Sequence, residues 1–371
     1  MTFCAQYLAV LHKSVTFADH KPFYRRAMNN HTNRFATTLL QWFEENARTL
    51  PWRGIGDAYA VWLSEVILQQ TRIEQGTDYW YRFMETFPTV EQLAEASEDE
   101  VLRLWQGLGY YSRARHLHQA ARQVVQMGGF PQTAREIVKL KGVGPYTAAA
   151  IASMAFGEDV AAVDGNVYRV LARHFGIDTP INSTQGQHTF HDLATSLLPA
   201  GKAGDFNQAL MDFGAMVCTP HAPHCLDCPL ADSCMAMASG QQSVLPVKLK
   251  TVKVKNLHFR CVYLRCQGYT AWCRRPSGGI WQGLWQPLLF EDDTRWQAFL
   301  NGLPQGQMPH LFRSGVKHVL THRVIMADFY LLDVSTRSPL PEGYQWIAEH
   351  DLDNHALPRL FEIMVSECPR P

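Results

Sequence analysis

Four cysteines and two histidines lie close together in CTPHAPHCLDCPLADSC, residues 218–234, with the spacing Cys-x6-Cys-x2-Cys-x5-Cys. Thiols at such spacing can pair as disulfides, bind zinc or bind an iron–sulfur cluster. The first residues of the chain lack a cationic start and a small-residue cleavage pattern, so we expect a reducing cytoplasm, where clustered cysteines are more often metal ligands than disulfides. The stretch therefore predicts a metal site. Zinc, with His221 or His224 as a further ligand, and iron–sulfur both fit, and composition alone favours zinc.

Two carboxylates in apolar surroundings offer a second kind of chemistry. Glu65 is the only charged residue between Asp57 and Arg72, in a segment whose helical pattern is apolar nearly all round. Burial raises a carboxyl pKa, which suits a general acid, whereas an exposed strip or a structural arginine partner is the alternative. Asp164 precedes a helical pattern, where an aspartate is also a favoured N-cap. Together the two residues suggest an acid and an anion, the pair that commonly cleaves a bond to a sugar's anomeric carbon.

A glycine-containing turn could contact a phosphate backbone. TAREIVKLKGVGPYTAAAIASMAFG, residues 133–157, predicts a helix, a tight turn and a second helix. Gly142 and Gly144 allow unusual dihedrals and close approach, and Pro145 suits the first turn of a helix. Backbone N–H groups at that helix N-terminus suit a phosphate of nucleic acid, and an ordinary helix connection is the alternative. Upstream, residues 104–115 place paired tyrosines beside arginines, which suits a wedge into a base stack, although paired tyrosines are also common in cores.

Composition and patterning set the framework for these residues. The chain has 371 residues, which favours more than one domain, and Lys plus Arg equals Asp plus Glu at 34 each. Any nucleic-acid surface must therefore come from local segregation of charge. The longest uncharged stretch, residues 142–157, falls short of the roughly 20 residues that span a membrane.

The periodicity changes along the chain and predicts a multidomain fold. Helical spacing dominates from about residue 34, where Phe35, Leu39, Trp42 and Phe43 share one face, whereas aromatic and branched residues partly alternate after the cysteines. We expect an all-α region followed by a smaller α+β domain. The predicted boundaries are a flexible N-terminal extension at 1–30, the helical region at 31–238, a linker at 239–255 and the second domain at 256–368.

The motifs SEVILQQT, GLGYYSRAR, LKGVGPYTA, VDGNVYRVLAR, FNQALMDFGAMVC and the cysteine spacing, in this order, resemble those of helix-hairpin-helix base-excision glycosylases of the MutY type, which are adenine DNA glycosylases. The resemblance covers residues 34–238 strongly and the remainder to 368 more weakly. It implies a helix-hairpin-helix glycosylase region with an iron–sulfur loop, followed by a Nudix-like domain. It also reverses the preference for zinc, since the family's four cysteines bind a [4Fe–4S] cluster, here through Cys218, Cys225, Cys228 and Cys234.

The resemblance also implies a reaction and a set of site residues. The substrate is duplex DNA in which adenine pairs with 8-oxoguanine or guanine, and the target nucleotide is flipped out of the stack. Glu65 then corresponds to the acid that protonates adenine, and Asp164 to the anion that stabilises an oxocarbenium-like sugar. Positions at the DNA are Trp52, Arg53, Gln70, Thr71, Leu108, Gly109 and Tyr110, with the hairpin glycines Gly142 and Gly144. Positions lining the adenine pocket are Tyr146, Asn166 and Gln208.

Tyr146 separates this chain from the nearest competing family. Endonuclease III, which shares the fold and the cluster but also nicks the strand, carries a lysine at this position for a Schiff base. Tyrosine cannot form an imine, so we expect water to attack and an abasic site to remain without efficient β-elimination. A non-catalytic DNA-binding module is disfavoured by the pairing of Glu65 with Asp164.

The Nudix-like segment departs from the hydrolases of that name. No dense acidic metal-binding segment follows Gly283, so we expect recognition of 8-oxoguanine and not hydrolysis of a diphosphate. The family's Phe-Ser-His loop is matched by Leu320, Thr321 and His322, where the aromatic residue is missing. An ordinary strand turn is the alternative for these residues. We further expect a monomer associated with the nucleoid of a bacterial-type cytoplasm, with no membrane partner.

Overall fold

The computed structural model of the protein describes residues 21–249 and 254–370. The chain divides into two compact units that alternate along the sequence: a helical unit, Met1–Leu50 with Ala152–Leu249, and a mixed unit, Pro51–Ile151 with Lys250–Pro371. Helix α9 (Pro145–Phe156) contains the boundary at residue 151. None of the helices in the described ranges is long and apolar enough to cross a lipid bilayer.

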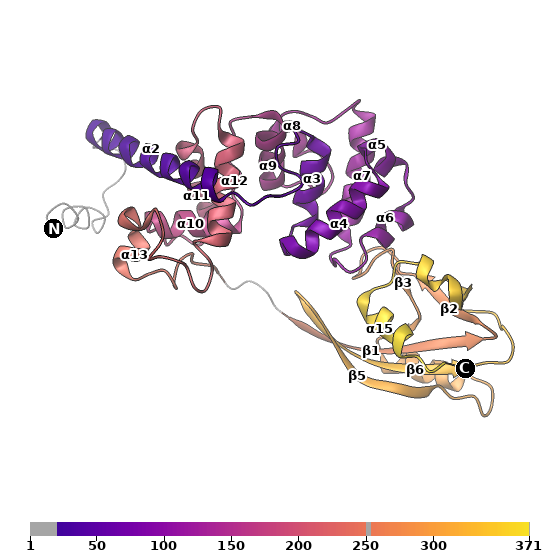
Figure 1. The fold of residues 1–371 in the computed structure, drawn as a ribbon. Coiled ribbons are helices and arrows are strands. Elements are labelled where there is room, and N and C mark those ends of the chain that lie inside the picture. The colour runs from indigo at the N-terminus through magenta and orange to yellow at the C-terminus, as the bar shows by residue number, and fades with distance from the viewer. Residues whose placement is uncertain (1–20, 250–253, 371) are drawn as a thin grey trace. The chain divides into compact units, whose positions relative to one another are not determined.

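Every regular element in the described part of the helical unit is a helix (Figure 1): α2 (Lys21–Asn46), α10 (Gly165–Phe175), α11 (Thr184–Leu197), α12 (Ala203–Met216), the 3-10 helix η1 (Ala231–Ser233) and α13 (Met235–Ser239). The predicted apolar face of α2 is confirmed. Phe35 and Leu39 are buried in the core of this unit, and Trp42 and Phe43 pack against it partly buried. Helices α10, α11 and α12 supply the other side of this core, which holds the segment before α10 in place.

Residues 51–151 form the helical part of the mixed unit: α3 (Ala58–Ile67), α4 (Ile73–Thr86), α5 (Val90–Glu95), α6 (Glu98–Leu104), α7 (Ser112–Gln126) and α8 (Ala134–Ile137). Local sequence explains several starts. Asp57 caps α3 by accepting from the Tyr59 N–H, and Ser97 and Glu100 form a reciprocal capping box on α6. Large aromatic side chains such as Trp62, Phe83 and Trp105 are fully buried among these helices.

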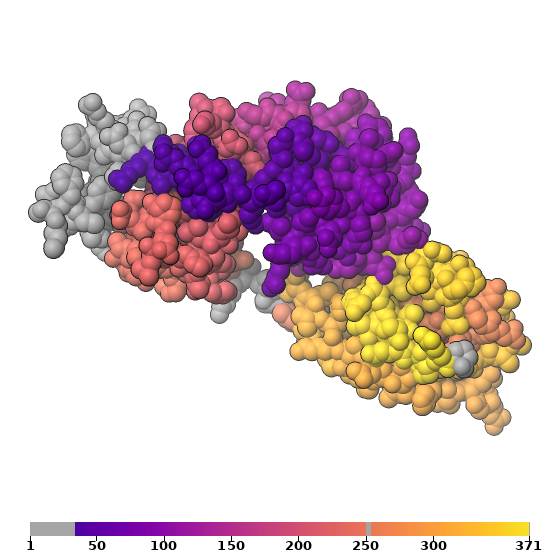
Figure 2. Space-filling view, in the orientation of Figure 1, coloured from indigo at the N-terminus to yellow at the C-terminus, as the bar shows by residue number. Residues whose placement is uncertain are grey.

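The rest of the mixed unit is an α+β domain built on one seven-stranded sheet within the described residues. Its elements are β1 (Lys255–Cys266), β2 (Tyr269–Arg274), β3 (Trp285–Gln286), β4 (Leu288–Phe290), α14 (Asp293–Asn301), β5 (His310–Leu320), β6 (Arg323–Asp333), β7 (Tyr344–Ala348), η2 (Glu349–Asn354) and α15 (Arg359–Glu367). The main strand order is β3-β2-β1-β6-β5; β4 pairs with β1, and β7 pairs with β2. The β1–β6 pair is parallel and the others are antiparallel. In the space-filling view (Figure 2) the residues from 254 onward, orange to yellow, form one continuous body.

Alternation along β1 produces the two cores of this domain. Phe259, Cys261 and Tyr263 face a core that includes α15, whereas Val262 and Leu264 face one that includes Trp296 of α14. Because successive strand residues point to opposite faces, one strand can serve both cores. The predicted order, an all-α region followed by an α+β domain, is confirmed.

The predicted domain boundaries can be set beside these elements. The predicted helical region 31–238 is spread over both units. Residues 21–30 of the predicted flexible extension belong to α2, and residues 1–20 lie outside the described residues. In the predicted linker, Leu245 is buried in the core of the helical unit, so the chain up to that point packs against α10 and is not a free connection.

Candidate active site and cysteine loop

Glu65 lies on α3, in the mixed unit. Every other residue of this helix is buried, and Glu65 itself is half-buried, so the helix is apolar nearly all round as predicted. The burial follows from sequence, because β-branched, aromatic and alanine residues occupy both faces of the short helix. Glu65 is therefore the least buried residue of an otherwise buried helix.

Asp164 lies in the helical unit and is the N-cap of α10. Its Oδ1 accepts from the Val167 backbone N–H at 2.8 Å, and its Oδ2 accepts from Asn166 Nδ2 at 2.8 Å. The N-cap role that the sequence offered as the alternative for Asp164 is therefore confirmed, and it does not conflict with a second role as the anion. Burial raises the pKa of Asp164, and the hydrogen bonds from Val167 and Asn166 oppose that shift. The hydrogen bonds thus hold the carboxylate in one orientation, in buried surroundings that disfavour its ionised form.

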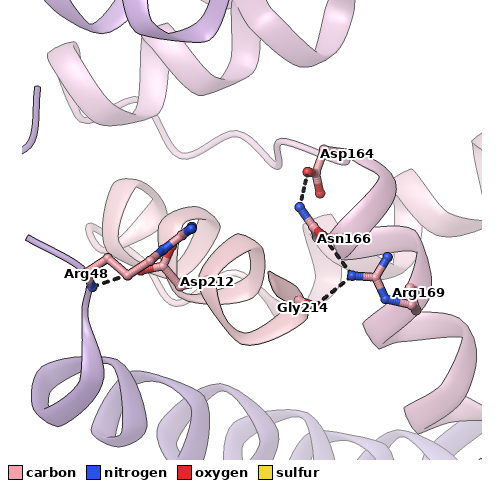
Figure 3. Close-up of polar contacts among 6 residues, drawn as sticks. All are labelled: Arg48, Asp164, Asn166, Arg169, Asp212 and Gly214. Atoms are coloured by element: carbon pink, nitrogen blue, oxygen red, sulfur yellow. Dashed lines mark hydrogen bonds and ion pairs between the residues drawn. The ribbon is translucent and has the colours of Figure 1, made fainter. Parts of the chain in front are cut away.

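A chain of hydrogen bonds connects Asp164 to the cysteine loop, and Figure 3 shows its part from Asp164 through Asn166 to Arg169. The buried Arg169 donates through Nη2 to Asn166 Oδ1 at 2.8 Å and to the Gly214 carbonyl at 2.7 Å. Its Nε donates to the Cys218 carbonyl at 2.7 Å. Because Asn166 in turn donates to Asp164, the position of the carboxylate depends on the backbone of the first cysteine of the loop.

Close packing of α12 against α10 makes this chain possible. A Cβ atom on Gly214 would lie 2.6 Å from the Asn166 Cβ atom and 3.1 Å from its Cα atom, so only glycine fits there without displacement. On the same helix, buried Asp212 accepts from Arg48, with Nε to Oδ1 at 3.0 Å, which ties α12 to the end of α2 (Figure 3).

Asn207 braces the segment that leads into Asp164, and sequence analysis did not single it out. Its Oδ1 accepts from the Ala162 N–H at 3.0 Å, and its Nδ2 donates to Ser153 Oγ and to the Val160 carbonyl, each at 2.9 Å. An asparagine that is fully buried with its amide satisfied on both sides is costly to replace. The neighbouring Gln208, a predicted pocket residue, is half-buried and donates to the Gly204 carbonyl at 3.2 Å. In the sequence, Asn207 could have been found as the asparagine that lies among the apolar residues Phe206, Ala209 and Leu210 of one helical segment.

The hairpin turn between α8 and α9 has the predicted form, with α9 beginning at Pro145. Gly142 needs its glycine, because its φ is +74° and a Cβ atom would lie 2.5 Å from the His116 Cβ atom. Gly144 does not have a left-handed φ, and a Cβ atom there would meet nothing within 4 Å. Of the two glycines, Gly142 uses the conformational freedom that the sequence offers, while the open space beside Gly144 leaves room for close approach by a ligand. Tyr146 is half-buried on the first turn of α9.

The predicted DNA-contact residues fall into two groups by exposure. Gln70 and Tyr110 are exposed and adopt left-handed backbone dihedrals, with φ of 60° and 47°, which cost about 1–3 kcal/mol at non-glycine residues. Tyr111, in contrast, is buried, so the paired tyrosines divide between surface and core. The remaining side chains of the set are buried (Trp52, Leu108) or half-buried (Arg53, Thr71), and Gly109 has a φ of +70°.

Thr321 and His322 are the two exposed turn residues of the β5–β6 hairpin, which is closed by the pair Leu320 and Arg323. Leu320 is half-buried against the core on the α15 side of the sheet. The hydroxyl of Thr321 hydrogen-bonds to the hydroxyl of Tyr110. The structure thus brings together two predicted DNA-contact residues that are far apart in the sequence.

The acidic residues after Gly283 are engaged in the domain's own structure. Asp292 caps α14 by accepting from the Arg295 N–H at 2.8 Å, and Asp293 forms an ion pair with Arg260 at 2.6 Å. Glu291 lies 4.0 Å from Arg275. Each of these three acidic residues thus has a partner within the domain.

The four cysteines of residues 218–234 lie half-buried in one loop of the helical unit. Burial raises the pKa of the Cys228 thiol to about 11, and the neighbouring Cys218, Cys234 and Cys225 act in the same direction. Backbone N–H groups point at two of them, from Leu230 toward Cys228 and from Ala236 and Met237 toward Cys234. The loop thus gathers thiols together with donors that would stabilise bound thiolates.

Buried Arg173 holds this loop against α10. Its guanidinium donates to Cys218 Sγ at 3.5 Å, to the carbonyls of Thr219 and Pro220 at 2.7 and 3.0 Å, and to the Leu245 carbonyl at 3.0 Å. In the described residues no three or more His, Cys, Asp or Glu side chains are grouped as a metal-ion site. Four thiols in one loop are the donor set of a [4Fe–4S] cluster and also of a structural zinc ion, so the residues present fit the cluster that the sequence predicts.

Family models match both parts of the chain. Residues 63–193 match the HhH-GPD superfamily of base excision DNA repair proteins, and residues 260–367 match the NUDIX domain. The first match spans both units, and the second covers nearly all of the α+β domain.

Curated relatives match over most of the chain. An adenine DNA glycosylase of Rattus norvegicus is 46% identical over 87% of this chain and 75% of its own length. The adenine DNA glycosylase of Homo sapiens is 46% identical over 90% of this chain and 74% of its own length.

Solved structures of glycosylases match 57% of this chain. A thermostable thymine-DNA glycosylase has a TM-score of 0.54 at 32% identity and covers 57% of this chain and 99% of its own. Endonuclease III in a non-covalent DNA complex has a TM-score of 0.50 at 20% identity, with 57% and 98% covered, and supports the fold alone.

Proposed function

Because this chain belongs to the adenine DNA glycosylase family, we propose that it releases adenine paired with 8-oxoguanine, or with guanine, from duplex DNA during base-excision repair. The observation that carries the proposal is the half-buried Glu65 on a helix whose other residues are all buried. That setting suits a carboxyl group that must keep a proton until the leaving base takes it.

The reaction breaks the bond between adenine and C1′ of its deoxyribose. Glu65 gives its proton to adenine, so the base departs neutral, and the electron pair of the broken bond goes with it. Asp164 stabilises the positive charge that develops on the sugar, and water then adds to C1′ and gives a proton to the Glu65 carboxylate, which restores the acid. The hydrogen bonds from Val167 and Asn166 support this role, since they keep the carboxylate oriented before charge develops.

Access to that bond requires the nucleotide to leave the base stack, at a cost of a few kcal/mol. Gln70 and Tyr110, both exposed and both in left-handed backbone, are suited to enter the space that the nucleotide vacates. The hairpin at Gly142–Gly144 leads into the N-terminus of α9 and suits a phosphate of the same duplex. Tyr146, Asn166 and Gln208 would line the adenine pocket.

Tyr146 and the acidic residues of the α+β domain define what the enzyme should not do. A phenol in place of an amine provides no Schiff base, so the strand should remain intact after base release. The carboxylates after Gly283 are occupied by Arg260, Arg275 and a helix cap, which supports a domain that recognises the partner base and does not hydrolyse a nucleotide. Thr321 and His322, exposed at the β5–β6 turn, are the residues that we assign to this recognition.

We assign the ligands of a [4Fe–4S] cluster to Cys218, Cys225, Cys228 and Cys234. When bound, the cluster would cross-link the loop of residues 218–234 and contribute no group to hydrolysis. Arg173 and the backbone N–H groups near Cys228 and Cys234 would stabilise the thiolates. Arg169, which binds the Cys218 carbonyl and Asn166, would make the position of Asp164 depend on that of the loop.

A single gel experiment tests the proposed function. A labelled duplex with adenine opposite 8-oxoguanine, and a second with adenine opposite guanine, are incubated with the protein and resolved with and without hot alkali. We expect breakage only after alkali, and faster with 8-oxoguanine. Breakage without alkali would instead identify a lyase, and no breakage under either condition would identify a DNA-binding protein without this activity.

Asn166→Ala should change the pH dependence of the reaction. Burial raises the pKa of Asp164 and the Asn166 amide opposes that shift, so loss of the amide should raise the pKa further. Asp164 acts as the anion, so the rate falls as the pH drops through this pKa. The acid limb of the single-turnover rate should therefore move to higher pH in the variant. An unchanged limb would mean that Asp164 does not control it.

Cys228→Ser should weaken iron binding and, through it, DNA affinity. A hydroxyl is a poor replacement for a thiolate ligand, so the purified variant should contain less iron and absorb less near 400 nm. Cys266→Ser, at a buried cysteine of the sheet domain, is the matched control and should keep its iron. Wild-type protein purified without oxygen that holds stoichiometric zinc and no iron would contradict the assignment.

A further inference from the structure

Arg113, on the first turn of α7, joins two separate backbone segments of the mixed unit. Its Nη1 donates to the carbonyls of Val66, Ile67 and Gln69 at 2.9, 3.1 and 2.5 Å. Its Nη2 lies 3.3 and 3.4 Å from the carbonyls of Leu108 and Gly109. One guanidinium thus satisfies carbonyls at the end of α3 and in the turn before α7.

The first of these segments is the end of the helix that carries Glu65. Carbonyls in the last turn of a helix lack partners within the helix, and a cation placed there also interacts favourably with the helix dipole. Arg113 supplies both, because it binds Val66 and Ile67 of α3 and also Gln69 beyond its end. The direction in which the chain leaves α3 therefore depends on this side chain.

Both segments continue into an exposed residue with left-handed backbone. Gln70 follows Gln69 with a φ of 60°, and Tyr110 follows Gly109 with a φ of 47°. Among the described residues, the only other non-glycine residues with positive φ are Gln267 and Trp281, which lie in the α+β domain. Such conformations persist where surrounding contacts enforce them, and Arg113 contacts the residue before each one.

The setting of Arg113 requires a planar, multivalent donor. Burial lowers the pKa of Arg113 to about 10, and its charge lies 5.0 Å from the ring centre of Trp105 and 5.6 Å from that of Tyr110. The two terminal nitrogens of the planar guanidinium, Nη1 and Nη2, can each donate to a different segment at once, whereas a lysine ammonium carries all its donors on one nitrogen. Arg113 also borders a cavity of about 120 Å³. If the guanidinium were removed, the adjacent space would enlarge and no neighbouring donor would take over its hydrogen bonds to the two segments.

We propose that Arg113 is a positioning residue that holds the segment of Gln70 and the turn of Tyr110 at a fixed separation, so that both enter the distorted duplex together. This inference rests on the proposed function, since it concerns the residues that replace the flipped nucleotide. Arg113 itself would not touch the reacting atoms.

Arg113→Lys tests the proposal, with Arg122→Lys as the matched control. Arg122 lies on the same helix and also donates to carbonyls of another segment, those of Ala94 and Ala96 at 3.1 and 3.5 Å, but that segment carries no predicted DNA contact. Hydrogen exchange of the protein without DNA is measured over residues 66–72 and 105–112. We expect R113K to accelerate exchange in both segments and R122K in neither.

The functional readout is the unstacking of DNA. A duplex with 2-aminopurine beside the target adenine reports extrusion by its fluorescence, and a single-turnover assay reports base release. We expect R113K to lose most of the fluorescence change and to release adenine ~10²-fold more slowly, as small misplacements of positioned groups do. R122K should match the wild type in both assays.

Several outcomes would overturn the inference. These are wild-type exchange in either segment of R113K, an undiminished fluorescence change in R113K, or an equal loss in R122K. If R113K does not fold, the wild type is examined with and without duplex, and slowing of exchange in only one of the two segments would overturn it. Failure of the proposed function is distinguishable, because the wild type itself would then release no adenine.

Discussion

Glu65→Gln is expected to slow adenine release by ~10²–10⁴-fold while leaving the fold and DNA binding intact. Glutamine matches the shape of glutamic acid but has no acidic proton to give, so adenine would have to leave as an anion. General acid catalysis typically contributes ~10²–10⁴-fold, which corresponds to about 3–5 kcal/mol of transition-state stabilisation. The rate of a single turnover on a duplex with adenine opposite 8-oxoguanine is the measurement.

The control for this variant is Glu85→Gln, which makes the same chemical change at an exposed glutamate of α4. It should retain the wild-type rate. Thermal unfolding of both variants should resemble that of the wild type, since glutamine fits the half-buried position of Glu65 without loss of volume. Base release by the Glu65 variant at the wild-type rate would remove the basis of the proposed mechanism.

Asp164→Asn should produce a loss of similar size for a different reason. Asparagine caps helices as well as aspartate does, so α10 should keep its N-cap and the free energy of unfolding should change little. What is lost is the negative charge, and removal of one preorganised electrostatic contact commonly costs ~10²–10³-fold in rate. The variant therefore separates the structural role of this residue from its catalytic role.

Two comparisons sharpen this test. Asp292→Asn makes the same change at the N-cap of α14 and should leave the rate unchanged. The wild-type rate should also approach that of the Asp164 variant as the pH falls through the raised pKa of Asp164, because protonation and amidation both remove the charge. A rate in D164N close to that of the wild type would leave Asp164 with the N-cap role alone.

Local sequence was sufficient for the features that depend on short-range chemistry. The burial of α3 around Glu65, the N-cap at Asp164 and the start of α9 at Pro145 were all predicted from spacing and residue type. Hydrophobic periodicity likewise predicted an all-α region followed by an α+β domain. Each of these follows from interactions within a few residues, where composition and helical geometry leave few alternatives.

The partners of these residues could not be predicted in the same way. Asn207 binds Ala162, in the segment before Asp164, although the two residues are 45 positions apart in the sequence. Arg113 binds Val66, which is 47 positions away. Such contacts carry no local pattern, because a buried polar side chain is satisfied by whichever backbone the fold brings to it. The turn glycines show the same limit, since the sequence allowed a left-handed backbone at both Gly142 and Gly144 and the structure has it at Gly142 alone.

The sequence by itself determined the family, and it predicted the two carboxylates and the four cysteines as site residues, because the identity and order of residues can be read without coordinates. Only the tertiary structure decided that Tyr110 is exposed while Tyr111 is buried, and that Arg169 connects Asn166 to the cysteine loop. The physical reason is that exposure and hydrogen-bond partners belong to the packed chain. They arise where helices distant in sequence approach closely, as α12 does at Gly214.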